Sequence, residues 1–378
     1  MDANQPKVSK PRLMSLDALR GFDMFWILGG EALFVGLLAW TGWQGWQIAD
    51  AQMKHSVWHG FTLYDLIFPL FIFLSGVALG LSPKRLDKLP MSARLPLYRH
   101  SFKRLGLLLI FGVLYNHGWG VGAPAAADEL RYASVLGRIA FAWFFAAMLV
   151  WHTALRTQVI VAILILVGYA LLQLFMPVPG GVAGDLSMAG SINAYVDSHL
   201  LPGISYQGRP TDPEGILSTL PAVVNALAGV FTGHFIVKQH PKGEWAKVSI
   251  LMLVGAAVLA LGWLCDGFLP VNKDLWTSSF VLVTTGWSLL LLGVFYALVD
   301  VLKLQGLAFV FVVIGCNAII IYLASSLVNW DYVARSIFGG LIQALPESMH
   351  LIVGTLALLT VQWLLLYWMY KRNIFIKV

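Results

Sequence analysis

The chain has 378 residues, of which 58% are hydrophobic and only 12% are charged, and its formal net charge is +6. This composition is too apolar for a soluble domain of ordinary make-up, and no polar block is large enough to hold a core of its own. A positive charge would suggest nucleic acid as a partner of a soluble protein, but the loops of a membrane protein explain it better here. We therefore expect one integral membrane domain over residues 1–378 and no nucleic-acid partner.

The N-terminal segment does not read as a cleavable signal, because its apolar part carries charges and no short apolar region with a small-residue cleavage site follows. We expect it to be retained. Cys265 and Cys316 both lie in apolar runs, which argues against a disulfide framework and against a thiolate metal site. No metal site is predicted.

Long apolar runs recur along the whole chain and predict an all-α polytopic membrane protein with about ten transmembrane helices. At roughly 20 residues per crossing, the expected spans are 15–39, 58–81, 104–118, 132–151, 158–176, 216–237, 248–265, 277–299, 307–328 and 350–370. The connection of about forty residues before the sixth span carries scattered Tyr, Ile and Leu. It is expected to form an ordered lid, since long ordered loops are usually functional.

Lys and Arg residues divide unevenly between the two sets of loops, with eighteen on one side and five on the other. The positive-inside rule then places both termini in the cytoplasm, and an even number of spans agrees with that placement. The excess of Lys and Arg over Asp and Glu therefore mostly reflects the orientation of the protein in the membrane.

The first span contains ionisable side chains, which are costly in a bilayer and need a partner or a purpose. Asp17, Arg20 and Asp23 follow one another at a spacing of three residues and share a helix face. They predict either a ladder of ion pairs or the entrance of a ligand site. Glu31 follows two glycines near the outer end of this span, where it is either paired with an arginine or catalytic.

The stretch KHSVWHGFTLYDLIFPLFIFLSG (residues 54–76) places His55 at the outer N-terminus of the second span, where free backbone N–H groups disfavour an imidazolium. Asp65 would lie roughly 15 Å deeper on a continuous helix, too far to touch His55. We expect Arg138 to form a buried pair with Asp65 or with Glu31. His55 is either an amphipathic interfacial side chain beside Trp58 or a catalytic residue.

Several blocks in fixed order carry a family resemblance: SLDALRGFDMFW, KHSVWHGFTLYDLIFPLFIFLSG, VLGRIA, DPEGILSTLPAVVNALAGVFTG, NKDLW, GCNAIIIYL and KRNIFIKV. The chain resembles the heparan-α-glucosaminide N-acetyltransferase family, and more closely its bacterial branch associated with N-acetylglucosamine utilisation. The resemblance implies a multi-pass protein of the bacterial inner membrane and a homodimer. It also implies the absence of the large lumenal domain, and of its extra span, that the animal enzyme carries.

The activity that this resemblance implies is acetyl transfer across the membrane. Acetyl-CoA would enter from the cytosol and donate its acetyl group to a glucosamine-type amine on the periplasmic side. The family's active-site histidine falls on His55 and its carboxylate on Asp65. The family's asparagine at the end of the first helix matches Glu31, a departure that suggests a general base at this position. His55 would act as a base or would itself be acetylated, and the sequence leaves both routes open.

Further polar residues are candidates for binding the two substrates. Acceptor contacts are expected from Asn116, His117, Trp58, Asn317 and Asp212, with helix packing or capping as the alternative for Asn116, His117, Asn317 and Asp212. The phosphates of CoA need cations, for which the candidates are Arg20, Arg104, Arg138 and Lys238. Two other functions stay open: a transporter for an amino sugar or a related metabolite, and O-acetylation of an envelope glycan.

Overall fold

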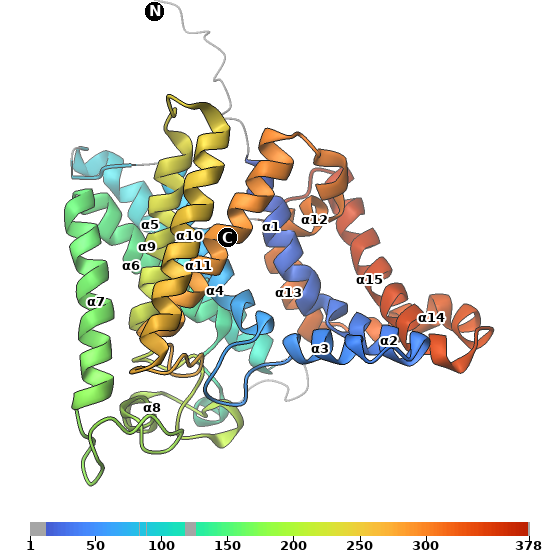
Figure 1. Cartoon of the computed structure of the whole chain (residues 1–378), viewed down its shortest axis with the longest axis horizontal. Helices are drawn as coiled ribbons and strands as arrows, with labels where there is room; N and C mark the ends of the chain where they lie inside the picture. Colours follow the sequence, from blue (N-terminus) through green and yellow to red (C-terminus); the bar gives the residue numbers. More distant parts are fainter. Residues whose placement is uncertain (1–12, 83, 88, 118–125, 377–378) are drawn as a thin grey trace, which may run out of the picture.

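The computed structural model describes residues 13–82, 84–87, 89–117 and 126–376, which fold into a bundle of helices (Figure 1). Seven helices in these ranges are long and apolar enough to cross a membrane, or up to nine if each of two bent helix pairs counts as one span. The described ranges contain no β-strand. The prediction of an all-α polytopic membrane protein is confirmed.

The elements before the long loop are α1 (Met14–Phe25), η1 (Trp26–Gly30), α2 (Ala32–Thr41), α3 (Gly45–Gln52), η2 (Leu63–Leu66), α4 (Ile67–Gly80), α5 (Met91–His117), η3 (Ala127–Glu129), α6 (Val135–His152) and α7 (Leu155–Phe175). Those that follow are α8 (Ile192–Leu200), η4 (Tyr206–Gly208), α9 (Thr219–Val237), α10 (Gly243–Asp266), α11 (Ser278–Phe295), η5 (Tyr296–Val301), α12 (Gln305–Cys316), α13 (Ala318–Leu327), α14 (Trp330–Gln343) and α15 (Glu347–Lys371).

Two of the predicted spans are broken. The first bends by 57° between η1 and α2, and the ninth bends by 63° between α12 and α13. Gly29 has a φ of +114° at the first break, a conformation that is costly for residues with a side chain. The third predicted span, 104–118, corresponds to the second half of α5. The helix begins earlier, at Met91, and its first half is basic.

The second predicted span begins later than expected. Residues 53–62 form a loop, and the helix starts at Leu63 with the short 3₁₀ turn η2 before α4. Three shorter helices, α2, α3 and α14, lie across the ends of the long helices in the lower right of Figure 1. Of these, α3 and α14 were not predicted. The late start of the second span matters most, because it changes the surroundings of His55.

Close helix packing holds α4 against α9. A Cβ atom added to Gly76 would lie 2.0 Å from the carbonyl oxygen of Ala226, and one added to Gly229 would lie 2.0 Å from that of Phe73. Neither position tolerates a side chain without a shift of backbone. Small residues at helix interfaces are the usual means of such close approach in membranes.

Two cores flank the middle of the molecule. One joins α4, α6, α7, α9 and α11, and the other joins α1, α5, α6, α12, α13 and α15. The connection from 177 to 218 is ordered, as predicted, and contains α8 and η4 at the lower end of Figure 1. Lys7, Lys10, Arg12, Lys88 and Lys377, which contribute to the orientation argument, lie outside the described residues, and the orientation stays a prediction.

Candidate active site

A cavity of about 1160 Å³ lies between the two groups of helices. Its walls come from α1, α4, α5, α6, α12 and α13. The connections between helices contribute His55, Ser56, Val57, Arg131, Tyr206, Arg209, Pro213, Glu214, Lys273 and Asp274. The lining residues on α4 run from Ile67 to Ala78, and Tyr64 of η2 precedes them. Twelve residues of helix span roughly 18 Å, which is more than half of a hydrocarbon core of about 30 Å.

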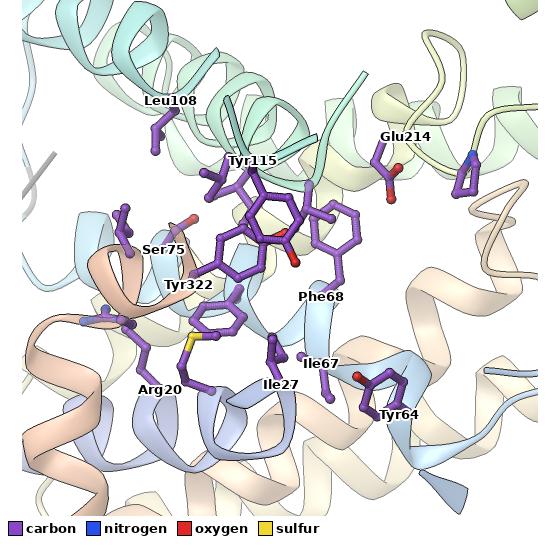
Figure 2. Close-up of a pocket in the computed structure, with 18 of the residues that line it drawn as sticks. Arg20, Ile27, Tyr64, Ile67, Phe68, Ser75, Leu108, Tyr115, Glu214 and Tyr322 are labelled. Atoms are coloured by element: carbon purple, nitrogen blue, oxygen red, sulfur yellow. The ribbon is translucent and has the colours of Figure 1, made fainter. Parts of the chain in front are cut away.

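The cavity has two polar ends and an apolar middle (Figure 2). We call one the Arg20 end, which is lined by Asp17, Arg20, Ser75 and Arg104. The other, the His55 end, is lined by His55, Tyr64, Glu214 and Lys273. Figure 2 shows Arg20 and Ser75 on one side, Glu214 and Tyr64 on the opposite side, and Tyr115 and Tyr322 between them. A single elongated molecule can therefore contact both ends at once.

His55 and Asp65 are in direct contact at the His55 end. His55 Nδ1 lies 2.8 Å from Asp65 Oδ1, and the Asp65 side chain is fully buried behind the imidazole. The expectation that these side chains lie too far apart was wrong, because it assumed a continuous helix from residue 58. The loop instead folds back over the start of η2 and brings His55 down to Asp65.

Asp65 also holds this loop in place. Its Oδ2 accepts hydrogen bonds from the backbone N–H groups of Ser56, at 3.2 Å, and Thr62, at 3.1 Å. Thr62 and Asp65 form a capping box at the start of η2. One carboxylate thus fixes both the loop and the histidine ring, so its position depends on the local fold and not on the ring alone.

The contact with Asp65 determines what the imidazole offers to the cavity. A neutral histidine that donates Nδ1–H to Asp65 carries its lone pair on Nε2. The His55 side chain is about half exposed and lines the cavity. Nε2, which does not contact Asp65, can therefore accept a proton or attack a carbonyl carbon.

Lys273 is a member of this cluster that the sequence analysis did not select. It lies in the loop between α10 and α11, and its Nζ is 3.1 Å from both ring nitrogens of His55 and 3.9 Å from Asp65 Oδ1. Burial lowers the pKa of Lys273, although nearby carboxylates oppose the shift. The available signal was its place in the block NKDLW, on the side of the protein with few cations.

The second histidine of the stretch is held by the same loop. The side-chain nitrogen of Asn272 lies 3.3 Å from His59 Nδ1, and Asn272 is fully buried. Burial lowers the pKa of His59, and the charge of Asp266 partly opposes this shift. Asn272 and Lys273 thus secure both histidines against the end of α10.

A second polar cluster borders the His55 end. Arg131 forms ion pairs with Asp212 and Glu214, and its guanidinium stacks over the Tyr206 ring at 4.8 Å. Asn116 donates to the backbone oxygen of Arg131 at 3.2 Å. The cavity is lined by Asn116, Arg131 and Glu214, whereas Asp212 is fully buried behind them. Asp212 therefore supports the wall and does not face a ligand.

Arg138 has a different role from the one predicted. It is 1% exposed, donates to Ser218 Oγ, and its guanidinium lies 4.6 Å from the centre of the Trp276 ring. It pairs with neither Asp65 nor Glu31, since Asp65 is taken by His55. It does not line the cavity, so its expected contact with CoA phosphates is wrong as well.

Glu31 lies one layer behind the cavity wall. It follows the break in the first span, does not line the cavity, and interacts with the hydroxyl of Tyr64. The Tyr64 ring in turn lies 4.7 Å from the His55 ring. Glu31 therefore reaches the candidate site only through Tyr64.

Four other candidates are placed away from the cavity. Trp58 donates its indole N–H to the backbone oxygen of Leu186 at 2.9 Å, and Asn317 binds the backbone of Ile374 and Ile376. These two residues, together with His117 and Lys238, do not line the cavity, and Lys238 is exposed. Their proposed contacts with substrate have no support in this geometry, because packing accounts for Trp58 and Asn317.

Arg20 and Arg104 are the two CoA-binding candidates that do line the cavity. Arg20 Nη1 lies 3.3 Å from Asp17 Oδ1, which forms the first half of the predicted ladder. Arg104 stacks over the Trp143 ring at 4.1 Å, and its buried Nε has no hydrogen-bond partner among the described residues. The positive charges of Arg20 and Arg104 repel one another, and an anionic ligand bound between them would offset this repulsion. Within the described ranges, no group of three or more His, Cys, Asp or Glu side chains could hold a metal ion.

Comparisons with known proteins agree with this architecture. No family model matches the chain. It is 27% identical to heparan-alpha-glucosaminide N-acetyltransferase of Homo sapiens over 363 residues, which cover 82% of this chain and 52% of that protein. It is also 27% identical to the Mus musculus protein of the same name over 431 residues, covering 98% of this chain and 61% of that protein. The chain thus spans between half and two thirds of the length of these relatives, and it is similar to them over most of its own length.

Proposed function

We propose that the protein is a membrane acetyltransferase. It takes an acetyl group from acetyl-CoA, whose phosphates bind at the Arg20 end, and transfers it to the amine of an amino sugar at the His55 end. The observation that carries the proposal is that His55 and Arg20 line the same cavity. The donor therefore never has to leave the side on which it binds.

The Arg20 end suits the anionic part of the donor. Arg20 and Arg104 supply two guanidinium groups, and Asp17 is the acidic lining residue beside them. Arginine binds phosphate with two parallel hydrogen bonds, which makes it well suited to a pyrophosphate group. The buried Nε of Arg104 is a donor that such a ligand would satisfy.

The apolar middle suits the pantetheine arm. The walls there consist of Met24, Phe68, Phe71, Leu136 and Ile139. A thin, largely apolar chain can extend through this section without losing many hydrogen bonds to water. The thioester at its tip then reaches the His55 end, where polar side chains replace the apolar wall.

The chemistry at the His55 end follows from the free Nε2 of His55. The amine nitrogen of the acceptor attacks the thioester carbonyl carbon, and the carbonyl electron pair moves onto its oxygen. Nε2 takes a proton from the amine, while Asp65 holds the ring and stabilises the imidazolium that forms. The oxygen pair then reforms the double bond, the carbon–sulfur bond breaks, and the CoA thiolate leaves with the proton from His55.

The acceptor is recognised by acidic groups on the wall. Glu214 and Asp274 line the His55 end beside Asn116 and Tyr206. Carboxylates attract a protonated amino sugar, and an aromatic ring beside them offers an apolar face to a pyranose. The proposed acceptor is therefore a glucosamine-type amine on the membrane face opposite to the donor.

A direct assay tests this function. Purified protein in lipid nanodiscs is incubated with acetyl-CoA carrying a ¹³C-labelled acetyl group and with glucosamine, and the products are identified by mass spectrometry. We expect labelled N-acetylglucosamine and free CoA from the wild-type protein. The His55→Ala variant should form neither, yet acetyl-CoA should still raise its melting temperature. Absence of product from a wild-type protein that binds acetyl-CoA would overturn the proposal.

A further inference from the structure

We propose that Lys273 is a further catalytic residue, whose ammonium group donates a hydrogen bond to the thioester oxygen as negative charge develops on it. This inference rests on the function proposed above. It assigns the oxyanion donor of the reaction to the ammonium group that lies against His55 at the His55 end.

The position of Lys273 is defined by His55. Its Nζ is 3.1 Å from Nε2, the nitrogen that faces the cavity, and 3.1 Å from Nδ1. Equal distances to both nitrogens place the ammonium beside the ring and not at the end of one lone pair. A carbonyl group attacked next to Nε2 then has its oxygen within reach of an N–H donor, which is the geometric requirement for an oxyanion donor.

The surroundings of Lys273 keep the group in place. Its side chain is 14% exposed and lines the cavity, so it is largely removed from water. The ionisable groups around His55 and Lys273 come from several elements: Tyr64 and Asp65 of η2, Glu214 before α9 and Asp274 of the same loop, with Arg138 of α6 acting through its charge. Arg209 pairs with Asp274 at 3.7 Å, whereas Lys273 contacts both the imidazole and Asp65.

The charge of Lys273 acts on the tetrahedral intermediate. A positive charge beside the reacting carbonyl stabilises the negative oxygen that forms when the amine attacks. No co-reactant is required, because Lys273 donates a hydrogen bond and keeps its proton throughout the step.

The test compares Lys273→Met with Lys54→Met in the assay described above. Lys54 is exposed, adjacent to His55 in sequence, and not in contact with the imidazole in the described structure. Removal of a single oxyanion donor typically lowers kcat by roughly 10²- to 10³-fold, and we expect this loss for Lys273→Met with unchanged binding of acetyl-CoA. Lys54→Met should act like the wild type. Lys273→Arg, which keeps the charge, should recover part of the activity.

A second readout separates this role from a structural one. An oxyanion donor acts only in the transition state, so Lys273→Met should lower kcat and leave the KM for both substrates within about threefold of the wild type. A displaced loop would instead raise the KM for the acceptor. If Lys273→Met fails to fold, Lys273→Gln takes its place in both measurements.

The outcomes distinguish this inference from the proposed function. If the wild type forms no product at all, both are overturned. If His55→Ala is inactive while Lys273→Met keeps a kcat within about threefold of the wild type, or loses activity through a raised KM alone, only the role of Lys273 is overturned. A loss of kcat with an unchanged KM supports it.

Discussion

The side chains of His55 and Asp65, ten residues apart in sequence, meet at 2.8 Å between Nδ1 and Oδ1. Asp65 is fully buried and His55 is half exposed, so the pair presents one face of the imidazole to the cavity and hides the carboxylate. This arrangement fixes the tautomer of the ring. It is the same relationship between base and orienting carboxylate that general-base catalysis uses in other proteins.

Replacement of Asp65 by Asn should disable this pair. The neutral amide no longer stabilises the imidazolium. Because it can donate or accept a hydrogen bond, it also lets His55 adopt either neutral tautomer, so kcat should fall by roughly 10²- to 10⁴-fold. Binding of acetyl-CoA at the distant Arg20 end should be unaffected. Steady-state kinetics and a thermal shift with acetyl-CoA measure both, with Asp331→Asn, an exposed carboxylate, as the control. Undiminished kcat in Asp65→Asn would remove the orienting role.

The Arg20 end should determine affinity for the donor. Hydrogen bonds to charged groups contribute about 1.5–3 kcal/mol each, so Arg104→Met should weaken acetyl-CoA binding by about tenfold or more. The KM for the acceptor should not change. Isothermal titration calorimetry on protein in nanodiscs gives the Kd, and Arg335→Met serves as control because Arg335 is exposed and remote from the cavity. Equal affinities of Arg104→Met and wild type would place the phosphates elsewhere.

Glu31 should contribute little to the chemical step. It lies behind Tyr64 and does not line the cavity. Glu31→Gln is therefore expected to keep its kcat within about tenfold of the wild type, whereas loss of a general base typically costs roughly 10²- to 10⁴-fold. A folded Glu31→Gln protein with a loss above a hundredfold would restore the sequence-based hypothesis that Glu31 is the base.

Asp197 should make the stability of the protein depend on pH. It is 4% exposed and accepts backbone N–H groups from Asp212 and Ile216, and burial raises its pKa to about 6. The folded state therefore binds this proton more tightly than the unfolded chain, whose carboxyl has a pKa of about 3.9. Its contribution to the free energy of unfolding is present below pH 4 and is lost as the pH rises through about 6.

The Asp197→Asn variant isolates this contribution. Melting temperatures measured in detergent between pH 4 and 7 should fall with rising pH more steeply for the wild type than for the variant. Above pH 7 the two curves should run parallel. Identical slopes throughout would mean that Asp197 titrates at its ordinary pKa.

Hydropathy alone predicts much of this fold. Apolar length located most of the predicted spans to within a few residues, because a bilayer forces long apolar helices whatever their neighbours are. The described residues contain seven to nine such spans, where about ten were predicted. It could not show the breaks at Gly29 and at Asn317, since both lie within continuous apolar runs. Bends of this kind depend on packing against other helices.

The main error at the candidate site had a local signal that could have prevented it. Thr62 and Asp65 stand three residues apart before an apolar run, which is the pattern of a capping box. A capping box at Thr62 and Asp65 predicts that the helix starts at Leu63, and it places His55 in a loop that can fold back. The distance between His55 and Asp65 then cannot be derived from helix geometry.

Other parts of the site could not be read from the sequence. Lys273 is 218 residues from His55, and neither segment carries a sequence pattern that predicts the contact. Arg138 and Asp212 were selected because charged residues near a membrane are usually functional. The structure gives both residues other partners than those expected: Arg138 contacts Ser218 and Trp276 in place of a carboxylate, and Asp212 pairs with Arg131.

Transfer between two compartments is the most direct test of the central claim. Wild-type protein is reconstituted into sealed liposomes, with labelled acetyl-CoA on one side of the membrane and glucosamine only on the other. If the cavity connects Arg20 with His55 as one reaction path, labelled N-acetylglucosamine accumulates in the compartment that holds the acceptor, and His55→Ala liposomes form none. Product that appears only when both substrates share a compartment would contradict the account.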